Sequence, residues 1–244
     1  MIKPVNEWVD AVYVLSVRKY ESRIRHVSAE LARCGIGFSF VFEHDADDLT
    51  QDQIDQYFLP SDLKRTHQSL VMKNIHVWNE ALAAGYKRIL VFEDDVQLNN
   101  RFSEGFDEAM RAAENLVPGW LIFLGGMDAH APSSYFRSAG PLVPLPLPTT
   151  EGCVLDREAI RRHLAWISHN KVRLPADHLM NAIDAETATP QYWLRHPVVE
   201  QGSVTGVFDS QLDQGRQRHG LRYNMLRYRW KRFCRRQLRD WFRR

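Results

Sequence analysis

The chain has 244 residues, of which 44% are hydrophobic and 25% charged, and its formal net charge of +2 is typical of an ordinary soluble globular protein with one large domain and at most an appendage. Its three cysteines are odd in number and far apart, so we expect a reducing cytosol and neither a disulfide framework nor a cysteine-based zinc site. The first residues lack the apolar core of a signal peptide, and no stretch of the sequence has the length and apolarity that a transmembrane helix needs.

The first half of the chain alternates strand-like and helix-like segments, which we identify by β-branched runs and by apolar residues at helical spacing. The expected elements are a strand at 11–17, a helix at 20–31, a strand at 38–42, a helix from the N-cap Thr50 to residue 57, a long helix from 60 to 84, a strand that ends in the acids 93–95, a helix at 101–115 and a strand at 120–124.

The pattern loosens in the second half. Residues 132–148 are rich in Pro, Ser and Gly and are expected to form a long surface loop, which is a common place for function. A strand at 149–155 and helices at 157–167 and 176–183 are expected after it. The alternation of strands and helices predicts an α/β protein built from parallel βαβ units, with ligand sites at the strand ends.

Three acids at the end of a buried strand are the most informative feature of the sequence. The apolar run 89–92 stops abruptly at Glu93, Asp94 and Asp95. Ligands of open α/β sheets bind outside the carboxyl ends of the strands, and hard cations such as Mg²⁺ or Mn²⁺ prefer oxygen ligands. These acids therefore indicate a divalent metal site. The alternative is that they cap the next helix or form a solvated turn.

The C-terminal residues form a separate basic segment, 208–244, after a domain at 1–207. Between Arg222 and Arg244 there are ten basic residues and one acid, Asp240. Apolar and aromatic residues recur among them at helical spacing: Leu226, Trp230, Phe233 or Cys234, Leu238 and Trp241. This pattern predicts a basic amphipathic helix that binds an anionic membrane surface. The alternative is that the apolar stripe packs on the domain itself. RNA binding is less favoured because no nucleic-acid module accompanies the segment.

Several motifs together resemble glycosyltransferase family 25, the lipopolysaccharide biosynthesis type. The resemblance covers residues 11 to about 207, and the acidic block is its most specific part. The motifs are Ala11–Leu15 with Arg18 and Arg23, Ser69-Leu70 with Trp78, Leu90–Val96, Trp120–Gly125, Thr149–Leu155, Leu174–Asp177, and Pro197 with Gln201–Ser203. The resemblance implies a GT-A-like, open, mostly parallel sheet flanked by helices, a nucleotide-sugar donor, a divalent cation (Mn²⁺ or Mg²⁺) and inverting transfer.

Transfer from a sugar diphosphate leaves negative charge on the departing phosphate, and a cation held by protein carboxylates stabilises that charge. Alternate side chains of an extended backbone point to the same side, so Glu93 and Asp95 are expected to point together and Asp94 the other way. We expect Asp95 to bind the metal directly. Glu93 or Asp94 would hold a metal-bound water or the ribose hydroxyls.

Other residues are candidates for the donor and for proton transfer. Asp45 follows the second strand and could contact the nucleoside, although it could also belong to a turn before a helix. Arg18 and Lys73 could pair with the diphosphate, whereas Arg23 is expected on a solvated helix surface. Inversion also requires a general base.

The general base is expected to be Asp177 or Glu151. Asp177 follows a proline just before a short helix, and Glu151 follows the Pro-rich loop. Each could instead have a structural role, such as a helix N-cap.

The function that we expect is transfer of a hexose, galactose in the first place, from a UDP-sugar to a lipopolysaccharide or other surface glycan. This would take place at the cytoplasmic face of a bacterial inner membrane, with no nucleic-acid partner. One alternative is a carboxylate-metal phosphohydrolase, although the first strand has no acid to serve as its nucleophile. Another is a non-enzymatic adaptor that binds membrane or nucleic acid through the basic segment.

Overall fold

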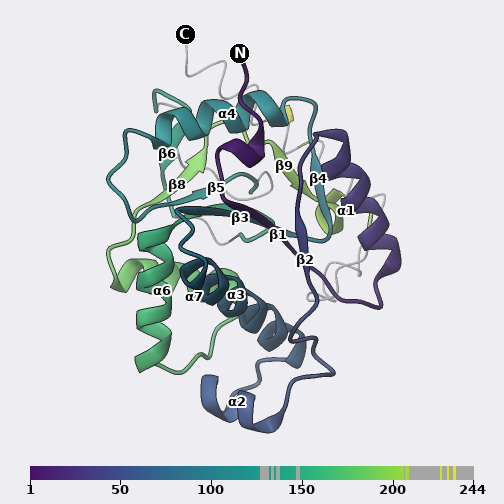
Figure 1. Cartoon of the computed structure of the whole chain (residues 1–244), viewed down its shortest axis with the longest axis vertical. Coiled ribbons are helices and arrows are strands. Elements are labelled where there is room, and N and C mark those ends of the chain that lie inside the picture. The colour runs from purple at the N-terminus through teal and green to yellow at the C-terminus, as the bar shows by residue number, and fades with distance from the viewer. Residues whose placement is uncertain are drawn as a thin grey trace.

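The apolar strand segments of the sequence assemble into one sheet with helices on both faces (Figure 1). The computed structural model describes residues 1–126, 132, 135, 138–146, 149–205, 207–208, 226, 230, 233 and 234. Within these residues seven strands pair in the order β2-β1-β3-β7-β5-β8-β6. Their bounds are β1 Ala11–Leu15, β2 Ser39–Val41, β3 Arg88–Glu93, β5 Leu121–Phe123, β6 Leu142–Pro144, β7 Gly152–Asp156 and β8 Gln191–Leu194.

Five of these seven strands run in the same direction. β1 is parallel to β2 and β3, and β5 is parallel to β8. β7 lies between β3 and β5 and is antiparallel to both, while β6 is antiparallel to β8 at one edge. The carboxyl ends of β1, β2 and β3 therefore meet at one edge of the sheet, which is where an open α/β sheet binds ligands.

Helices cover both faces of this sheet and enclose two apolar cores. The described helices are η1 Val5–Glu7, α1 Glu21–Arg33, α2 Gln51–Tyr57, α3 Arg65–Ala83, α4 Phe102–Ala113, α6 Arg157–His169, α7 Ala176–Glu186 and α8 Gly202–Thr205. Alternate residues of a strand face opposite sides. In β3, Ile89 and Val91 pack with α3, α6 and α7, whereas Leu90 and Phe92 pack with α1 and α4.

A second, two-stranded sheet brings the C-terminal part of the domain against the acidic turn. β4 (Val96–Leu98) begins two residues after β3 ends and pairs antiparallel with β9 (Val199–Gln201). α8 starts directly after β9. Segments that lie about a hundred residues apart in the sequence are thereby held side by side at the end of β3.

Local sequence signals explain where several elements begin and end. Thr50 and Gln53 form a reciprocal capping box at the start of α2. The Asp156 side chain accepts a hydrogen bond from the Glu158 backbone at the start of α6. Gly85 follows α3 with φ of 75°, a conformation in which a glycine has no Cβ penalty.

The structure confirms the open, mostly parallel sheet flanked by helices, and it corrects several details. The predicted parallel pairing holds for β1 with β2 and β3 and for β5 with β8, whereas β6 and β7 are antiparallel to their neighbours. The expected loop at 132–148 contains β6, which pairs with β8 despite its prolines because it is an edge strand. The long helix begins at Arg65 rather than near residue 60.

Most of the basic segment lies outside the described residues. Of it, Leu226, Trp230, Phe233 and Cys234 are helical, and the first three are exposed. None of the described helices combines the length and the apolarity needed to cross a bilayer.

Candidate functional site

A pocket of about 160 Å³ opens where β1 and β3 end. Leu15, Ser16 and Val17 reach it from the end of β1, Glu93 and Asp94 reach it from the end of β3, and the loop after β2 closes another side. Its remaining lining residues come from α1, the loop before it, the β2–α2 loop and the first turns of α3: Lys19, Tyr20, Arg23, Ala46, Asp47, Thr66, Ser69, Leu70 and Lys73. This is the position that the sheet topology predicts for a ligand.

The three acids do not continue the strand. β3 ends at Glu93, and Asp94 and Asp95 form a turn before β4. Strand alternation therefore does not apply beyond Glu93, and the expectation that Asp94 points away from Glu93 is wrong, because both line the pocket. Of the three acids, Glu93 and Asp94 line the pocket, whereas Asp95 does not.

Asp94 is buried and fixed by two partners. One oxygen accepts a hydrogen bond from the Ser16 hydroxyl at 2.8 Å, and the other pairs with the Arg23 guanidinium at 2.7 Å. The Arg23 side chain is only 12% exposed and lies between the rings of Tyr20 and Phe208. The expectation of a solvated Arg23 is thus wrong. Burial beside the carboxylate places a fixed positive charge at the pocket wall.

Asp95 is held by the chain segment that follows β9. Its Oδ2 atom accepts a hydrogen bond from the Ser203 backbone at 3.1 Å, and its carbonyl oxygen accepts one from the Gly202 backbone. Its Oδ1 atom is buried and has no hydrogen-bond partner among the described residues. Burial raises the pKa of Asp95 and the neighbouring Asp94 adds to this, while Arg23 opposes both. A buried carboxylate oxygen without a partner is a costly group that a cation would satisfy.

Glu93 completes the acidic turn. Its carboxylate accepts a hydrogen bond from the Thr150 hydroxyl at 2.5 Å, and the Gln201 amide lies 3.5 Å from its other oxygen. Burial, followed by the charge of Asp95, raises the pKa of Glu93 to about 8. Repulsion between two neighbouring acids is the condition that a divalent cation relieves.

These residues fit a cation as a partial set of ligands. In the described parts of the chain, no group of three or more His, Cys, Asp or Glu residues forms a complete metal cage. Asp95 offers an unpartnered oxygen, and Glu93 offers a second hard ligand beside it. A cation bound here would take its other ligands from water or from the phosphates of a substrate, as Mg²⁺ commonly does.

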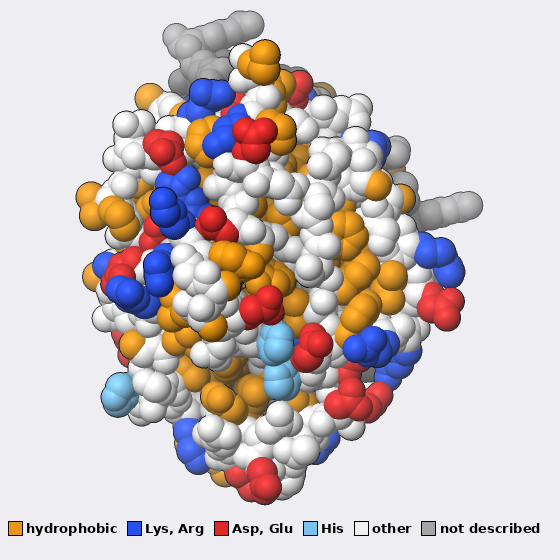
Figure 2. All heavy atoms as spheres, viewed as in Figure 1, with side chains coloured by type: hydrophobic (Ala, Val, Ile, Leu, Met, Phe, Trp, Pro, Cys, Tyr) orange, Lys and Arg blue, Asp and Glu red, His pale blue; other side chains and the backbone are white. Residues whose placement is uncertain are grey.

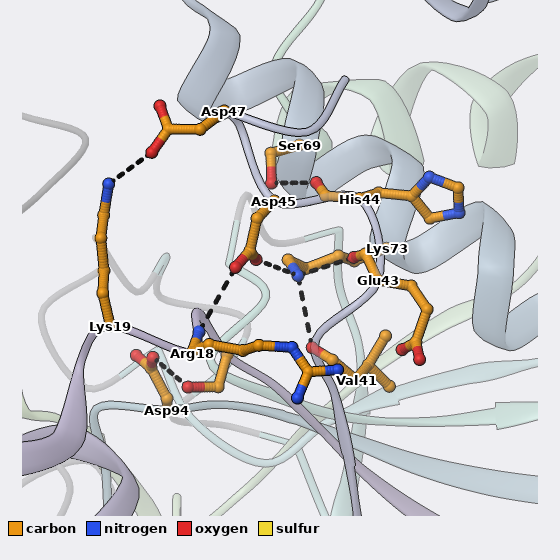
Figure 3. Close-up of polar contacts among 11 residues, drawn as sticks. Arg18, Lys19, Val41, Glu43, His44, Asp45, Asp47, Ser69, Lys73 and Asp94 are labelled. Carbon is orange, nitrogen blue, oxygen red and sulfur yellow. Dashed lines mark hydrogen bonds and ion pairs between the residues drawn. The ribbon is translucent and has the colours of Figure 1, made fainter. Parts of the chain in front are cut away.

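Lys73 lies on the other side of the pocket and holds the β2–α2 loop in place (Figure 3). Its ammonium donates to the carbonyl oxygens of Val41 and Glu43 at 3.3 and 2.7 Å and pairs with the Asp45 carboxylate at 2.7 Å. Burial lowers the pKa of Lys73, and the pair with Asp45 opposes this shift. The three donor positions of the ammonium are therefore used within the loop.

Asp45 and Arg18 connect the β1–α1 loop with the β2–α2 loop. The second Asp45 oxygen accepts a hydrogen bond from the Arg18 backbone at 3.3 Å, while the exposed Arg18 guanidinium lies 4.7 Å from the centre of the Phe42 ring. An ion pair between Lys19 and Asp47 joins the same loops at the pocket rim (Figure 3). The Asp-x-Asp pattern at 45–47 thus fixes two loops against each other.

The two candidate bases occupy different places. Glu151 is 6% exposed, accepts a hydrogen bond from the Gly126 backbone, and its backbone carbonyl accepts one from the Glu93 backbone. Asp177 lies in the first turn of α7, where it accepts a hydrogen bond from the His178 backbone. Burial lowers the pKa of His67 in α3, and the negative charge of Asp177 opposes this shift. Glu151 therefore neighbours the acidic turn, whereas Asp177 is not among the residues that line the pocket.

Some site residues give little signal in the sequence. Ser16 and Thr150 are single polar residues next to strands, and Ser203 contributes a backbone group. Ser69 binds the His44 carbonyl at 2.6 Å from inside α3. All four residues lie within or next to the motifs that carry the resemblance. Their contacts with the site, however, depend on the fold and cannot be inferred from the motifs.

Comparisons with known proteins agree with the resemblance. Residues 9–129 match the model of glycosyltransferase family 25 (LPS biosynthesis protein). This region includes β1, β3 and all three acids. No curated protein matches the sequence.

Two solved structures are similar in part. Mouse xyloside xylosyltransferase 1 in its apo form has 19% identity, a TM-score of 0.40, and coverage of 75% of this chain and 72% of that one. A glycosyltransferase involved in glycosylation of the major capsid of PBCV-1 has 12% identity, a TM-score of 0.42, and coverage of 75% and 80%. The matched region, residues 9–129, contains every residue that lines the pocket, and the protein is a glycosyltransferase that is similar over this region to family 25.

Proposed function

We propose that the protein transfers a hexose, galactose in the first place, from a UDP-sugar to a lipopolysaccharide or another surface glycan, with inversion at the anomeric carbon and with a divalent cation. The observation that carries this proposal is the pocket at the ends of β1 and β3, which Glu93 and Asp94 line. Asp95 follows directly behind this lining, and its buried Oδ1 atom has no hydrogen-bond partner among the described residues. The family match supports the reaction class.

Each side of the pocket would have its own task in donor binding. Asp95 and Glu93 would hold Mn²⁺ or Mg²⁺, and the bound cation supplies a Lewis acid that stabilises the departing diphosphate. Arg23, fixed by Asp94, adds positive charge at the same wall. Asp45 and Lys73 would shape the loop that meets the nucleoside, and Arg18 would approach the phosphates from the β1–α1 loop.

The general base remains a choice between two carboxylates. Glu151 is supported by its position. It follows Thr150 and immediately precedes β7, and its backbone carbonyl accepts a hydrogen bond from the Glu93 backbone. Asp177 is more exposed than Glu151, and its carboxylate accepts a hydrogen bond from the adjacent His178 backbone. The base would accept the proton of the acceptor hydroxyl as the new glycosidic bond forms.

We further propose that the basic segment brings the enzyme to an anionic, cytoplasmic membrane surface, where a glycolipid acceptor is found. The exposed, helical Leu226, Trp230 and Phe233 support this placement, and the rings of Trp230 and Phe233 stack at 5.9 Å. Aromatic anchors among arginines suit a membrane interface.

Thermal unfolding with Mn²⁺, with UDP-galactose, and with both together tests the donor site. A ligand at a hundred times its Kd stabilises a fold by about 2.7 kcal/mol, which raises the Tm of a chain of this size by roughly 5 to 10 °C. The full rise should require both ligands, because a cation held by Asp95 and Glu93 would strengthen the binding of the negatively charged diphosphate. Asp95→Asn should lose the rise and keep the Tm of the unliganded protein.

The exposed Asp62→Asn is the matched control and should behave as wild type. UDP-glucose and GDP-sugars, added in parallel, identify the donor. The absence of a shift with every nucleotide sugar, with or without Mn²⁺, would overturn the proposal.

A further inference from the structure

A second cavity lies beside the donor pocket and shares none of its lining residues. It is a groove of about 470 Å³ between α2 and α3. Met72 and Ile75 of α3 form its buried floor, and His44, Tyr57 and His76 contribute rings to its walls. Figure 2 shows histidine side chains together near the middle of this face, with acidic side chains on either side.

The position of His44 is costly for the backbone. Its φ is 63°, in the left-handed region that residues other than glycine rarely adopt. The Ser69 hydroxyl holds its carbonyl oxygen at 2.6 Å, and its ring meets the His76 ring edge to face at 5.5 Å. In Figure 3 the His44 imidazole points away from Asp45 and Lys73. With this backbone conformation the His44 ring lines the groove and not the donor pocket.

Polar side chains surround these rings. The Gln53 carbonyl oxygen serves the α2 cap, and the Asn79 amide nitrogen donates to the Ile75 carbonyl, which leaves the other end of each amide for a ligand. Among the described residues the Gln56 amide has no hydrogen-bond partner, and the Glu80 carboxylate lies 3.8 Å from the His76 ring nitrogen. Amides and a carboxylate are thus spaced along a wall whose floor is apolar.

We propose that this groove binds a neutral oligosaccharide. A pyranose ring has one apolar face of C–H groups, which packs on flat rings such as those of Tyr57 and His44. Its neighbouring hydroxyls donate and accept hydrogen bonds together, which matches the amides of Gln56 and Asn79 and the Glu80 carboxylate. A few polar groups above an apolar floor are the usual composition of a small-ligand site.

The charges around the groove favour a neutral sugar over an anionic one. Glu43 and Glu80 flank the two histidines. Burial, with the nearby His76 and Lys73, lowers the pKa of His44, so its ring is neutral at pH 7. Lys73 is committed to the loop behind His44 and does not enter the groove wall. A phosphorylated or sialylated sugar would meet negative charge there.

The groove and the donor pocket share the β2–α2 loop. His44 faces the groove, whereas Ala46 and Asp47 line the donor pocket. A glycan held in the groove would therefore lie next to the donor loop, and its role as an anchoring site for the acceptor glycan rests on the proposed function. Sugar binding itself does not rest on it.

Proton NMR of the full chain with lactose, without nucleotide or metal, tests the inference. Lactose should receive saturation transfer from the protein and should shift the ring C–H resonances of His44 and His76. The double variant Gln56→Ala/Asn79→Ala removes two exposed helix side chains and should weaken binding about tenfold, as expected for the loss of two hydrogen bonds. Gln51→Ala, an exposed glutamine of α2 outside the groove, is the matched control and should bind as wild type.

Sialyllactose is the second probe and should bind at least about tenfold more weakly than lactose, by like-charge repulsion. Lactose binding of undiminished affinity in the double variant, or no lactose-induced shift of the two histidines, would overturn the groove assignment. The groove stands if lactose binds while UDP-sugars fail to stabilise the protein, and the proposed function stands if the opposite holds, so the two failures are distinguishable.

Discussion

Lys73 illustrates how a single buried charge can organise a loop. The Lys73 side chain is only 3% exposed. Its ammonium binds the Val41 carbonyl at the end of β2, the Glu43 carbonyl in the loop and the Asp45 carboxylate. An unpaired charge at this depth is far more costly than the net worth of the pair. The residue therefore controls the wall of the donor pocket even without touching a substrate.

We expect Lys73→Met to lower the free energy of unfolding by about 3 kcal/mol, because it leaves the Asp45 carboxylate buried without its partner. Adding Asp45→Asn should restore part of this loss. Urea unfolding measures both changes. Lys19→Met, which breaks an exposed pair at the same rim, should leave stability nearly unchanged. Equal losses at Lys73 and Lys19 would contradict this account.

Glu93 should make the stability of the unliganded protein depend on pH. Its pKa is about 8 in the folded protein, above its ordinary value of 4.5. Between these values the folded state keeps a proton that the unfolded state releases, so this contribution is present below pH 4.5 and is lost as the pH rises through 8. Glu93→Gln, which has no proton to release, should flatten the fall in Tm between pH 5 and pH 8. Parallel curves for the two proteins would refute it.

At the scale of elements, Glu151 reaches the acidic turn because β7, which follows it, pairs with β3 and β5. Gly125 follows β5 and lies against Glu151, next to β7. A Cβ atom at Gly125 would lie 2.2 Å from the Glu151 Oε1 atom. The close approach of the Glu151 side chain, and not a positive φ, is therefore the reason for a glycine at position 125.

Gly125→Ala should displace the Glu151 side chain, since an added Cβ would lie 2.6 Å from its Cγ atom, and should break its bond to the Gly126 backbone. If Glu151 is the general base, turnover should fall on the order of a hundredfold or more. Steady-state transfer and Tm together check this. Gly85→Ala is the opposite control: its positive φ costs about 1 kcal/mol of stability, but turnover should persist. Normal turnover in Gly125→Ala would remove Glu151 from the mechanism.

At the scale of the whole molecule, charge is segregated. Ten basic residues and one acid lie between residues 222 and 244, so the rest of the chain is net acidic. An acidic catalytic domain would be repelled by an anionic membrane, and the basic segment would overcome this repulsion.

Deletion of residues 222–244 should abolish binding to vesicles that contain phosphatidylglycerol, since each basic residue near the surface contributes about 1 kcal/mol. Transfer to a soluble acceptor analogue should continue, because the donor pocket lies wholly within residues 15–94. Vesicle sedimentation and a transfer assay measure the two effects, with neutral vesicles as the control. Loss of both activities would favour the adaptor alternative.

The sequence by itself determined the order of the elements and the acidic strand end. Apolar runs such as 89–92 and capping residues such as Thr50 are local signals, and local signals are readable without a fold. The family match covers this same region, 9–129. The strand β6 and the antiparallel β7 were not readable, because strand direction and edge position depend on partners distant in the sequence.

The tertiary structure decided which polar atoms of the site are already bonded within the protein. The turn at Asp94 and Asp95, the pair of Arg23 with Asp94, and the approach of Ser203 to Asp95 each join segments that no local pattern connects. The same is true of the groove, since His44 and His76 come from different elements. Burial and long-range hydrogen bonds set which charges are paired and which remain for a ligand, and these arise only when the distant segments pack.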